Sequence, residues 1–145
     1  MTAYIGATLS VVASVPATED AAGYGLLTFV EIAKVISVGQ IGDTHEDLSD
    51  TLLKTGRTDH LNGAVDGGEV EVVLEYDPAD ADPGYAIIDA GNGTNTQHSF
   101  ELVDPDSETH YFQGVIANLK HRERTASTRK GATFTIRVNS GIVTA

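Results

Sequence analysis

Apolar and polar residues alternate with a period of two along much of this chain. In residues 69–76, EVEVVLEY, the apolar side chains fall mainly on one face of an extended segment, and three glutamates fall on the other. Residues 132–138, ATFTIRV, repeat the pattern with threonines and an arginine on the polar face. This periodicity is typical of antiparallel strands that pack one face on a core and expose the other to water.

Four more segments have strand character. Residues 98–103 and 110–121 are predicted to form a hairpin, because the Asp-Pro-Asp between them is favourable turn chemistry. Residues 4–12 are interpreted as a first strand and not as a signal peptide, because no Lys or Arg precedes the apolar part. Residues 28–38 are predicted to form one strand with four branched side chains on a common face: Val30, Ile32, Ile36 and Val38.

One helix is predicted, at about residues 82–91. Asp82 can cap its first turn, Pro83 suits the first helical position, and Gly91 or Gly93 can end it. The acidic run just before it, DPADAD, lacks the ligand order of a calcium loop, so capping explains these residues better.

These elements predict a single, mainly β domain spanning residues 1–145: a two-sheet antiparallel sandwich or rolled barrel with one short α-helix and one long polar loop or hairpin. The long loop, residues 39–68, is the unusual part. Compact domains usually connect their elements through about 4–6 residues, and much longer connections tend to be functional or disordered.

Charge is distributed unevenly along the 145 residues, whose net charge is −12. Residues 1–118 hold 20 acidic and three basic side chains, whereas residues 119–145 hold one acidic and six basic side chains. Phosphate backbones repel such an acidic chain, so tight binding to nucleic acid is not expected. Two interpretations of this charge imbalance are open. The acidic residues form a solubilising surface, or the chain is a bipolar subunit whose basic end contacts the acidic side of another copy.

No motif of catalysis, metal binding or cofactor binding is found. The chain has no cysteine, which excludes thiolate chemistry, and it has no run of about 20 apolar residues for a membrane span. None of its five histidines has the spacing of a metal motif, so all are expected to be solvated or on strand surfaces: His45, His60, His98, His110 and His121. The sequence therefore predicts no enzyme, no metal and no cofactor.

The order of these features resembles the major tail tube proteins of long, non-contractile-tailed phages, of which the lambda-type major tail protein is the best known. The resemblance covers residues 28–143, and its most specific part is HYFQGVIANLKHRERTASTRKGATFTIRV, residues 110–138. The family also includes the tail tubes of gene transfer agents and is related to type VI secretion tube proteins.

The resemblance implies a structural virion protein whose copies form six-membered rings that stack into a hollow tail tube. DNA passes through the lumen without sequence-specific binding, and the tape measure protein occupies the lumen earlier. Further implied partners are the tail-tip or baseplate proteins and the tail terminator, with no membrane. The implied location is the virion tail, and the host cytoplasm during assembly.

The resemblance also assigns roles to three groups of residues as hypotheses. The long loop would reach the adjacent ring through Asp43, Glu46, Asp47, Asp50, Lys54, Arg57 and Asp59, unless it is an ordinary mobile loop. An acidic strand face would line the lumen, or else the tube exterior, through Glu69, Glu71 and Glu75. A basic segment would contact other subunits through Lys120, Arg122, Arg124, Arg129 and Lys130.

Two alternatives stay open at this stage. A monomeric β-sandwich module could bind carbohydrate or protein, although the absence of Trp counts against an aromatic sugar platform. A tail terminator or another ring protein that does not polymerise would share many of the same features.

Overall fold

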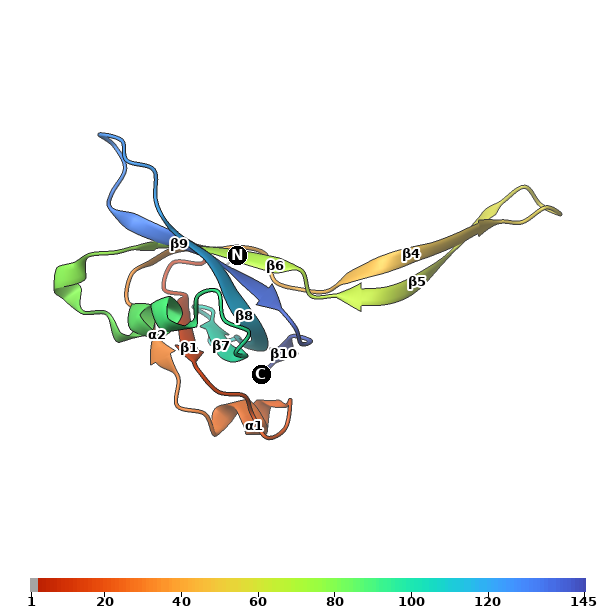
Figure 1. Cartoon of the computed structure of the whole chain (residues 1–145). Helices are drawn as coiled ribbons and strands as arrows, with labels where there is room; N and C mark the ends of the chain where they lie inside the picture. Colours follow the sequence, from red (N-terminus) through yellow and green to blue (C-terminus); the bar gives the residue numbers. More distant parts are fainter. Residues whose placement is uncertain (1–2) are drawn as a thin grey trace.

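The computed structural model describes residues 3–145 and is mainly β, as the sequence predicts (Figure 1). Seven strands follow one another in one antiparallel sheet in the order β2-β1-β7-β8-β9-β6-β3, and β10 pairs with β8 beside this path. The strands of this sheet are β1 (Thr8–Val12), β2 (Val30–Glu31), β3 (Val35–Val38), β6 (Glu69–Glu75), β7 (His98–Val103), β8 (Thr109–His121), β9 (Gly131–Val138) and β10 (Val143–Thr144).

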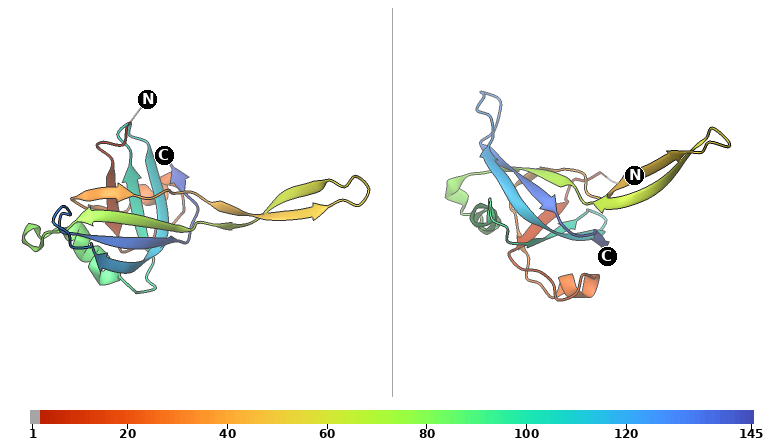
Figure 2. Two further views of the ribbon diagram at one scale, coloured as in Figure 1. Left: turned by 90° about the horizontal axis from the view of Figure 1, so that it is seen from above. Right: turned by 45° about the vertical axis from the view of Figure 1, so that its right-hand side comes forward.

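The sheet is rolled, so that the layer of β3, β6 and β9 crosses the layer of β1, β7 and β8 (Figure 2). The long strand β8 belongs to both layers, because it pairs with β7 along its first half and with β9 along its second. A register shift follows Ala117, and Asn118 has a positive φ of 57°. Bulges of this kind bend a strand and increase its twist, which lets β8 turn from one layer into the other.

The core lies between the two layers and is built from the apolar faces that the alternation predicts. Val70, Val72 and Leu74 of β6 are buried, as are Phe134 and Ile136 of β9. Across from them the rings of two fully buried phenylalanines of β7 and β8 stack with their centroids 5.4 Å apart: Phe100 and Phe112. Each such side chain contributes about 1.5–3 kcal/mol through burial of its apolar surface.

Helix α2 (Pro83–Gly91) begins and ends as the sequence predicts. The backbone N–H of Gly84 donates to Asp82 Oδ1 over 3.0 Å, and Pro83 occupies the first turn. The helix packs on the sheet through Ile88, which is fully buried. Two shorter helical elements were not predicted: α1 (Ala21–Gly25) and the 3-10 turn η1 (Pro78–Asp80).

The prediction of a single strand at residues 28–38 is wrong. The segment divides into β2 and β3, which lie at opposite ends of the sheet order. In β3 the register shifts between Val35 and Ser37. Val35 and Val38 therefore pack against the core, while Ile36 is 52% exposed. Hydrophobic periodicity does not show where a strand breaks and changes edges.

The long polar connection, expected as a loop or hairpin, contains a two-stranded hairpin with one register shift. Strands β4 (Thr44–Thr51) and β5 (Thr58–Asp66) form a separate sheet that extends away from the body of the molecule (Figure 1). We call residues 43–66 the arm. Within residues 3–145 no helix has the length and apolar character needed to cross a membrane.

Candidate functional site

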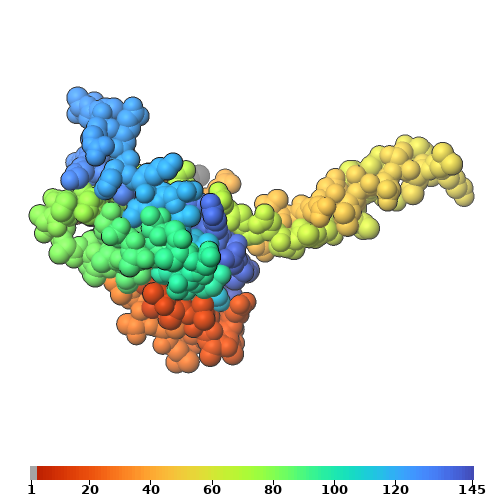
Figure 3. Space-filling view, viewed as in Figure 1, coloured from red at the N-terminus to blue at the C-terminus, as the bar shows by residue number. Residues whose placement is uncertain are grey.

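The arm exposes apolar side chains that nothing in the protomer covers. Every residue of β4 is exposed and only one residue of β5 is partly shielded. Of the ten large apolar side chains that are exposed in the described part of the chain, five belong to the arm: Leu48, Leu52, Leu53, Leu61 and Val65. Figure 3 shows the arm as a thin projection beyond the packed body. Isolated two-stranded hairpins are marginally stable in water, so packing against another surface would stabilise this element.

Charge in the arm is also poorly balanced. Asp50 and Asp59 lie directly opposite each other across the hairpin, and like charges in such cross-strand pairs are destabilising. Among the described residues neither carboxylate takes part in an ion pair. His60 Nδ1 lies 3.1 Å from an Asp47 oxygen on the other face, in a pair that is more than half exposed. A cationic surface would relieve the repulsion between Asp50 and Asp59.

The arm joins the body at a glycine pair. A Cβ on Gly67 would lie 2.8 Å from a Val138 side-chain carbon, and Gly68 has a left-handed φ of 71°. The Gly68 N–H donates to Asp66 Oδ1 over 2.9 Å, and its carbonyl accepts from the Val138 N–H over 3.0 Å. These contacts fix the base of the arm against the end of β9.

The predicted acidic face on β6 exists, but part of its charge is neutralised. Glu69 and Glu71 are exposed and Glu75 is half-buried, in agreement with the alternation. Glu69 Oε1 lies 3.3 Å from Arg137 Nε, and Glu75 Oε2 lies 3.4 Å from Arg129 Nη1. The sequence did not reveal these two pairs, because each arginine lies far along the chain from its glutamate. Only the pairing of β6 with β9 brings them close together.

The basic segment occupies the end of β8 and the loop that leads to β9. This loop, residues 122–130, rises above the sheet in Figure 1. Arg122 Nη1 donates to the Arg129 carbonyl over 3.4 Å, and Lys130 Nζ lies 5.7 Å from the centre of the Tyr76 ring. Arg124 is exposed and has no ion pair in the described structure. The basic segment therefore exposes positive charge on a projecting loop that is held in part by the contacts of Arg122 and Lys130.

The acidic residues before α2 have structural partners, as predicted. Asp77 caps the 3-10 turn by accepting from the Ala79 N–H over 3.0 Å, and Asp82 caps α2. Asp80 accepts from Lys34 Nζ over 2.8 Å, which raises the pKa of Lys34. These carboxylates stabilise the segment that leads into α2.

The histidines are less uniform than the sequence suggested. Three are exposed, as predicted: His45, His60 and His121. His98 is 2% exposed, so its prediction as a surface residue is wrong. Its Nδ1 lies 2.9 Å from the Thr96 carbonyl, and its ring fills the space beside Gly91 of α2, where a Cβ would be 2.6 Å away. His110 is partly buried beside two carboxylates.

Sequence reasoning also missed the way the N-terminal region packs on β8. Tyr24 of α1 is fully buried, and its hydroxyl accepts from Gln113 Nε2 over 3.1 Å. Its ring stacks on Tyr111 with the centroids 5.0 Å apart, and partial burial of the Tyr111 hydroxyl raises the pKa of Tyr111. Ser99 Oγ donates to the Ser14 carbonyl over 2.6 Å. Together these contacts attach residues 14–24 to the outer face of the sheet.

No protein-family model matches the chain, and no curated protein matches it. Solved structures do resemble it over nearly all of its length. A chain of the tail of an empty gene transfer agent particle, refined with C6 symmetry, matches with a TM-score of 0.65 and 14% identity, covering 100% of this chain and 99% of that one.

Two other solved structures come from different particles. A chain of the six-fold symmetrised baseplate of the anti-feeding prophage matches with a TM-score of 0.62 and 11% identity, over 96% of this chain and 91% of that one. A chain of the sheath-tube complex of the PVC extracellular contractile injection system matches with a TM-score of 0.59 and 11% identity, over 100% and 91%. At such low identity these likenesses establish a shared fold. One of these particles is a contractile injection system, so the shared fold does not single out a non-contractile tail.

Proposed function

We propose that this chain is a non-catalytic structural subunit of a phage-type tail tube. Copies form rings of six that stack into a hollow tube. The observation that carries the proposal is the arm, a solvent-exposed hairpin with uncovered leucines on a fold shared with a chain from a C6-symmetric tail. Within tail tubes, the order of sequence features in residues 28–143 favours a long, non-contractile tail.

The arm is the proposed contact between successive rings. Its apolar side chains and its opposed carboxylates, Asp50 and Asp59, need a surface that combines apolar and cationic groups. The basic segment supplies cations on another projection of the same chain, and Arg124 there is exposed. Acidic and basic surfaces on one subunit favour association between copies in a fixed orientation. Lys54 and Arg57 at the arm's tip then meet acidic residues of the neighbouring ring.

The acidic face of β6 is the proposed wall of the lumen. A passage for DNA must not hold phosphates, because each neutralised phosphate strengthens binding. Glu71 is exposed and outside any ion pair of the described structure, and the positive charges of Arg137 and Arg129 are offset by their pairs with Glu69 and Glu75. If this face lay outside the tube, its charge would have no such role.

The remaining partners follow from a tube in a virion. The tape measure protein fills the lumen before DNA, a baseplate or tail-tip complex starts the tube, and a terminator ends it. The subunit is made and assembled in the host cytoplasm, and it stays in the tail of the finished particle.

Electron microscopy of the purified protein in negative stain tests the proposal. Hollow tubes of stacked rings, with six-fold symmetry in end views, are the expected result at high protein concentration. Single rings that never stack indicate a terminator-like protein, and separate particles at every concentration indicate a monomeric binding module. Either of these outcomes contradicts the proposal.

A further inference from the structure

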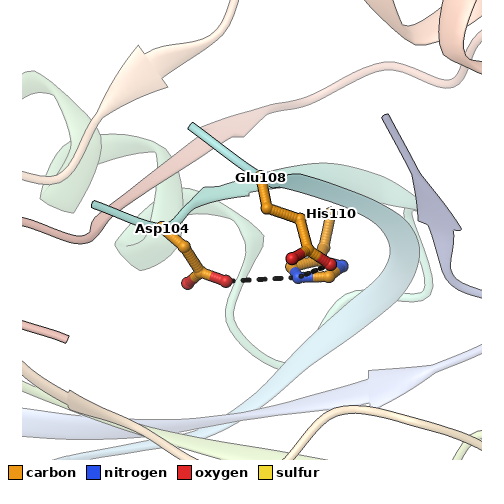
Figure 4. Close-up of side chains that lie close together, drawn as sticks. All are labelled: Asp104, Glu108 and His110. Atoms are coloured by element: carbon orange, nitrogen blue, oxygen red, sulfur yellow. Dashed lines mark hydrogen bonds and ion pairs between the residues drawn. The ribbon is translucent and has the colours of Figure 1, made fainter. Parts of the chain in front are cut away.

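The turn between β7 and β8 brings three metal-ligating side chains together outside the surfaces described above. Asp104, Glu108 and His110 lie on one face of this hairpin, with their side chains directed at one another (Figure 4). The turn is tight, because the Asp104 N–H donates to the Glu108 carbonyl and the Ser107 N–H donates to the Asp104 carbonyl, both over 2.9 Å. Asp104 therefore lies opposite Glu108, and His110 follows two residues later on the same face.

Both carboxylates approach the same nitrogen of His110. Its Nε2 lies 3.3 Å from Asp104 Oδ2 and 3.5 Å from Glu108 Oε1. The His110 and Asp104 side chains are only 17% and 16% exposed, whereas the Glu108 side chain is half exposed. The cluster is thus a partly enclosed site with one accessible ligand, unlike the exposed pair of His60 and Asp47 on the arm.

The other nitrogen of the ring has its own partner. His110 Nδ1 lies 3.0 Å from the Thr144 hydroxyl oxygen of β10, which can accept a hydrogen bond. With Nδ1 engaged by Thr144, Nε2 is the ring nitrogen that faces the two carboxylates. The two negative charges converge on this nitrogen, and either a proton on Nε2 or a bound metal ion offsets them.

We propose that Asp104, Glu108 and His110 bind a divalent transition-metal ion, with zinc as the best match. Zinc takes nitrogen and oxygen ligands at about 2.0–2.2 Å in a tetrahedron, which separates neighbouring ligand atoms by about 3.3–3.6 Å. The distances of 3.3 and 3.5 Å from His110 Nε2 to the two carboxylate oxygens meet this requirement. A metal-binding imidazole also commonly donates its other N–H to an oxygen, the position that Thr144 occupies here.

Three protein ligands leave a fourth coordination position for water. Asp104 and His110 also line a cavity of about 840 Å³ whose other walls are residues 4–9 and residues 35–41. This cavity gives the ion and its water a route to the site. Through Thr144 the bound ion also connects the β7–β8 turn to β10, so binding stabilises the edge at which the last strand pairs.

The sequence did not reveal the site because its single histidine has no second histidine nearby. The ligands stand at positions i, i+4 and i+6, and only the hairpin turn places the first beside the others. The pattern D-x-x-x-E-x-H brings three metal-ligating side chains together only when a hairpin turn of this length separates the aspartate from the glutamate.

Isothermal titration calorimetry of untagged protein with zinc chloride tests the proposal. The expected result is saturable binding of one ion per chain, and a matching increase in the melting temperature. Replacing zinc by cobalt(II) should produce visible ligand-field absorption with the intensity of a tetrahedral site. Magnesium and calcium, which prefer six or more oxygen ligands, should bind much more weakly.

Three variants make the test specific. H110N and E108Q should each weaken zinc binding by about tenfold or more, whereas H60N, which removes the exposed histidine–aspartate pair on the arm, should leave it unchanged. Because Glu108 is half exposed, E108Q keeps the fold, and circular dichroism checks this for each variant. Absence of saturable binding to the wild-type protein, or equal affinity in E108Q and wild type, would overturn the proposal. The readouts do not involve assembly, so they are independent of the proposed tube.

Discussion

Gly114 lies at the centre of β8, where this strand pairs with β7 on one side and with β9 on the other. A Cβ at this position would lie 2.5 Å from the Arg137 carbonyl oxygen and 2.8 Å from Ile136 Cγ2. Backbone atoms inside a sheet cannot move away without loss of strand pairing. Close packing between β8 and β9 therefore explains why glycine occupies position 114 in the segment Phe112–Val115.

Gly114→Ala should lower the free energy of unfolding by about 1–3 kcal/mol, since overpacking forces the two strands apart. Urea denaturation followed by circular dichroism measures the effect. Gly25→Ala is the matched control, because nothing lies within 4 Å of a Cβ there. Equal stability of Gly114→Ala and the wild type would contradict the close packing.

Tyr24→Phe should also destabilise the protein, by about 1–3 kcal/mol, because the buried Gln113 amide loses the hydroxyl that accepts its hydrogen bond. The amide retains only the longer contact of 3.3 Å to Glu19. Tyr4→Phe serves as control, since Tyr4 is 77% exposed. Unchanged denaturation midpoints for both variants would mean that α1 does not depend on this bond.

At the residue scale, the sequence predicted what local chemistry decides. Asp82 and Pro83 were assigned correctly because capping depends on neighbours within a single turn. The burial of His98 and the pairing of Glu75 with Arg129 were missed, because each depends on a residue from a distant part of the chain. The candidate metal ligands are close together along the chain, but the geometry of the β7–β8 turn is needed to place them beside one another.

At the scale of elements, the strands with a buried face were predictable and the arm was not. Strands β6 and β9 carry strict alternation because one face of each is fully buried. The arm has no buried face, so its residues show no alternation that separates a hairpin from a polar loop. The division of residues 28–38 into β2 and β3 occurs at a turn over residues 32–34, and this turn leaves no periodic signal.

A substitution at the arm tip tests whether the arm docks on another copy of the chain. Leu53→Asp should leave the stability of the protomer within about 0.5 kcal/mol of wild type, because Leu53 is fully exposed, yet it should reduce polymer yield strongly. Leu26→Asp is the control, since Leu26 is 85% exposed on the body. Sedimentation of polymerised samples measures the yield. Normal polymerisation of Leu53→Asp would remove the arm tip from the contact.

The basic segment is the second proposed contact at this scale. Arg122→Glu combined with Arg124→Glu should stop polymerisation, because the reversed charges repel the acidic arm of the next ring. The double lysine variant at the same positions keeps the charge and should polymerise. Tubes of normal length from the glutamate variant, seen in negative stain, would exclude these arginines from subunit contacts.

At the scale of the whole molecule, the rolled sheet and the arm differ in how far their apolar side chains are buried within the protomer. The rolled sheet has its own buried core, whereas the arm extends into solvent with its leucines exposed and its carboxylates opposed. Fold class was predictable from periodicity. The sheet order, with β1 between β2 and β7, was not, because long-range strand pairing is not encoded in any local segment.

The central claim is that the arm acquires its stabilising contacts only from other copies of the chain. Hydrogen exchange of the backbone amides in β4 and β5, compared between dispersed protomers and assembled protein, tests it most directly. We predict fast exchange of these amides in the protomer and strong protection after assembly, with β6 and β9 protected in both states. Arm amides already protected in the dispersed protomer, or still exchanging freely in the assembled protein, would contradict the claim.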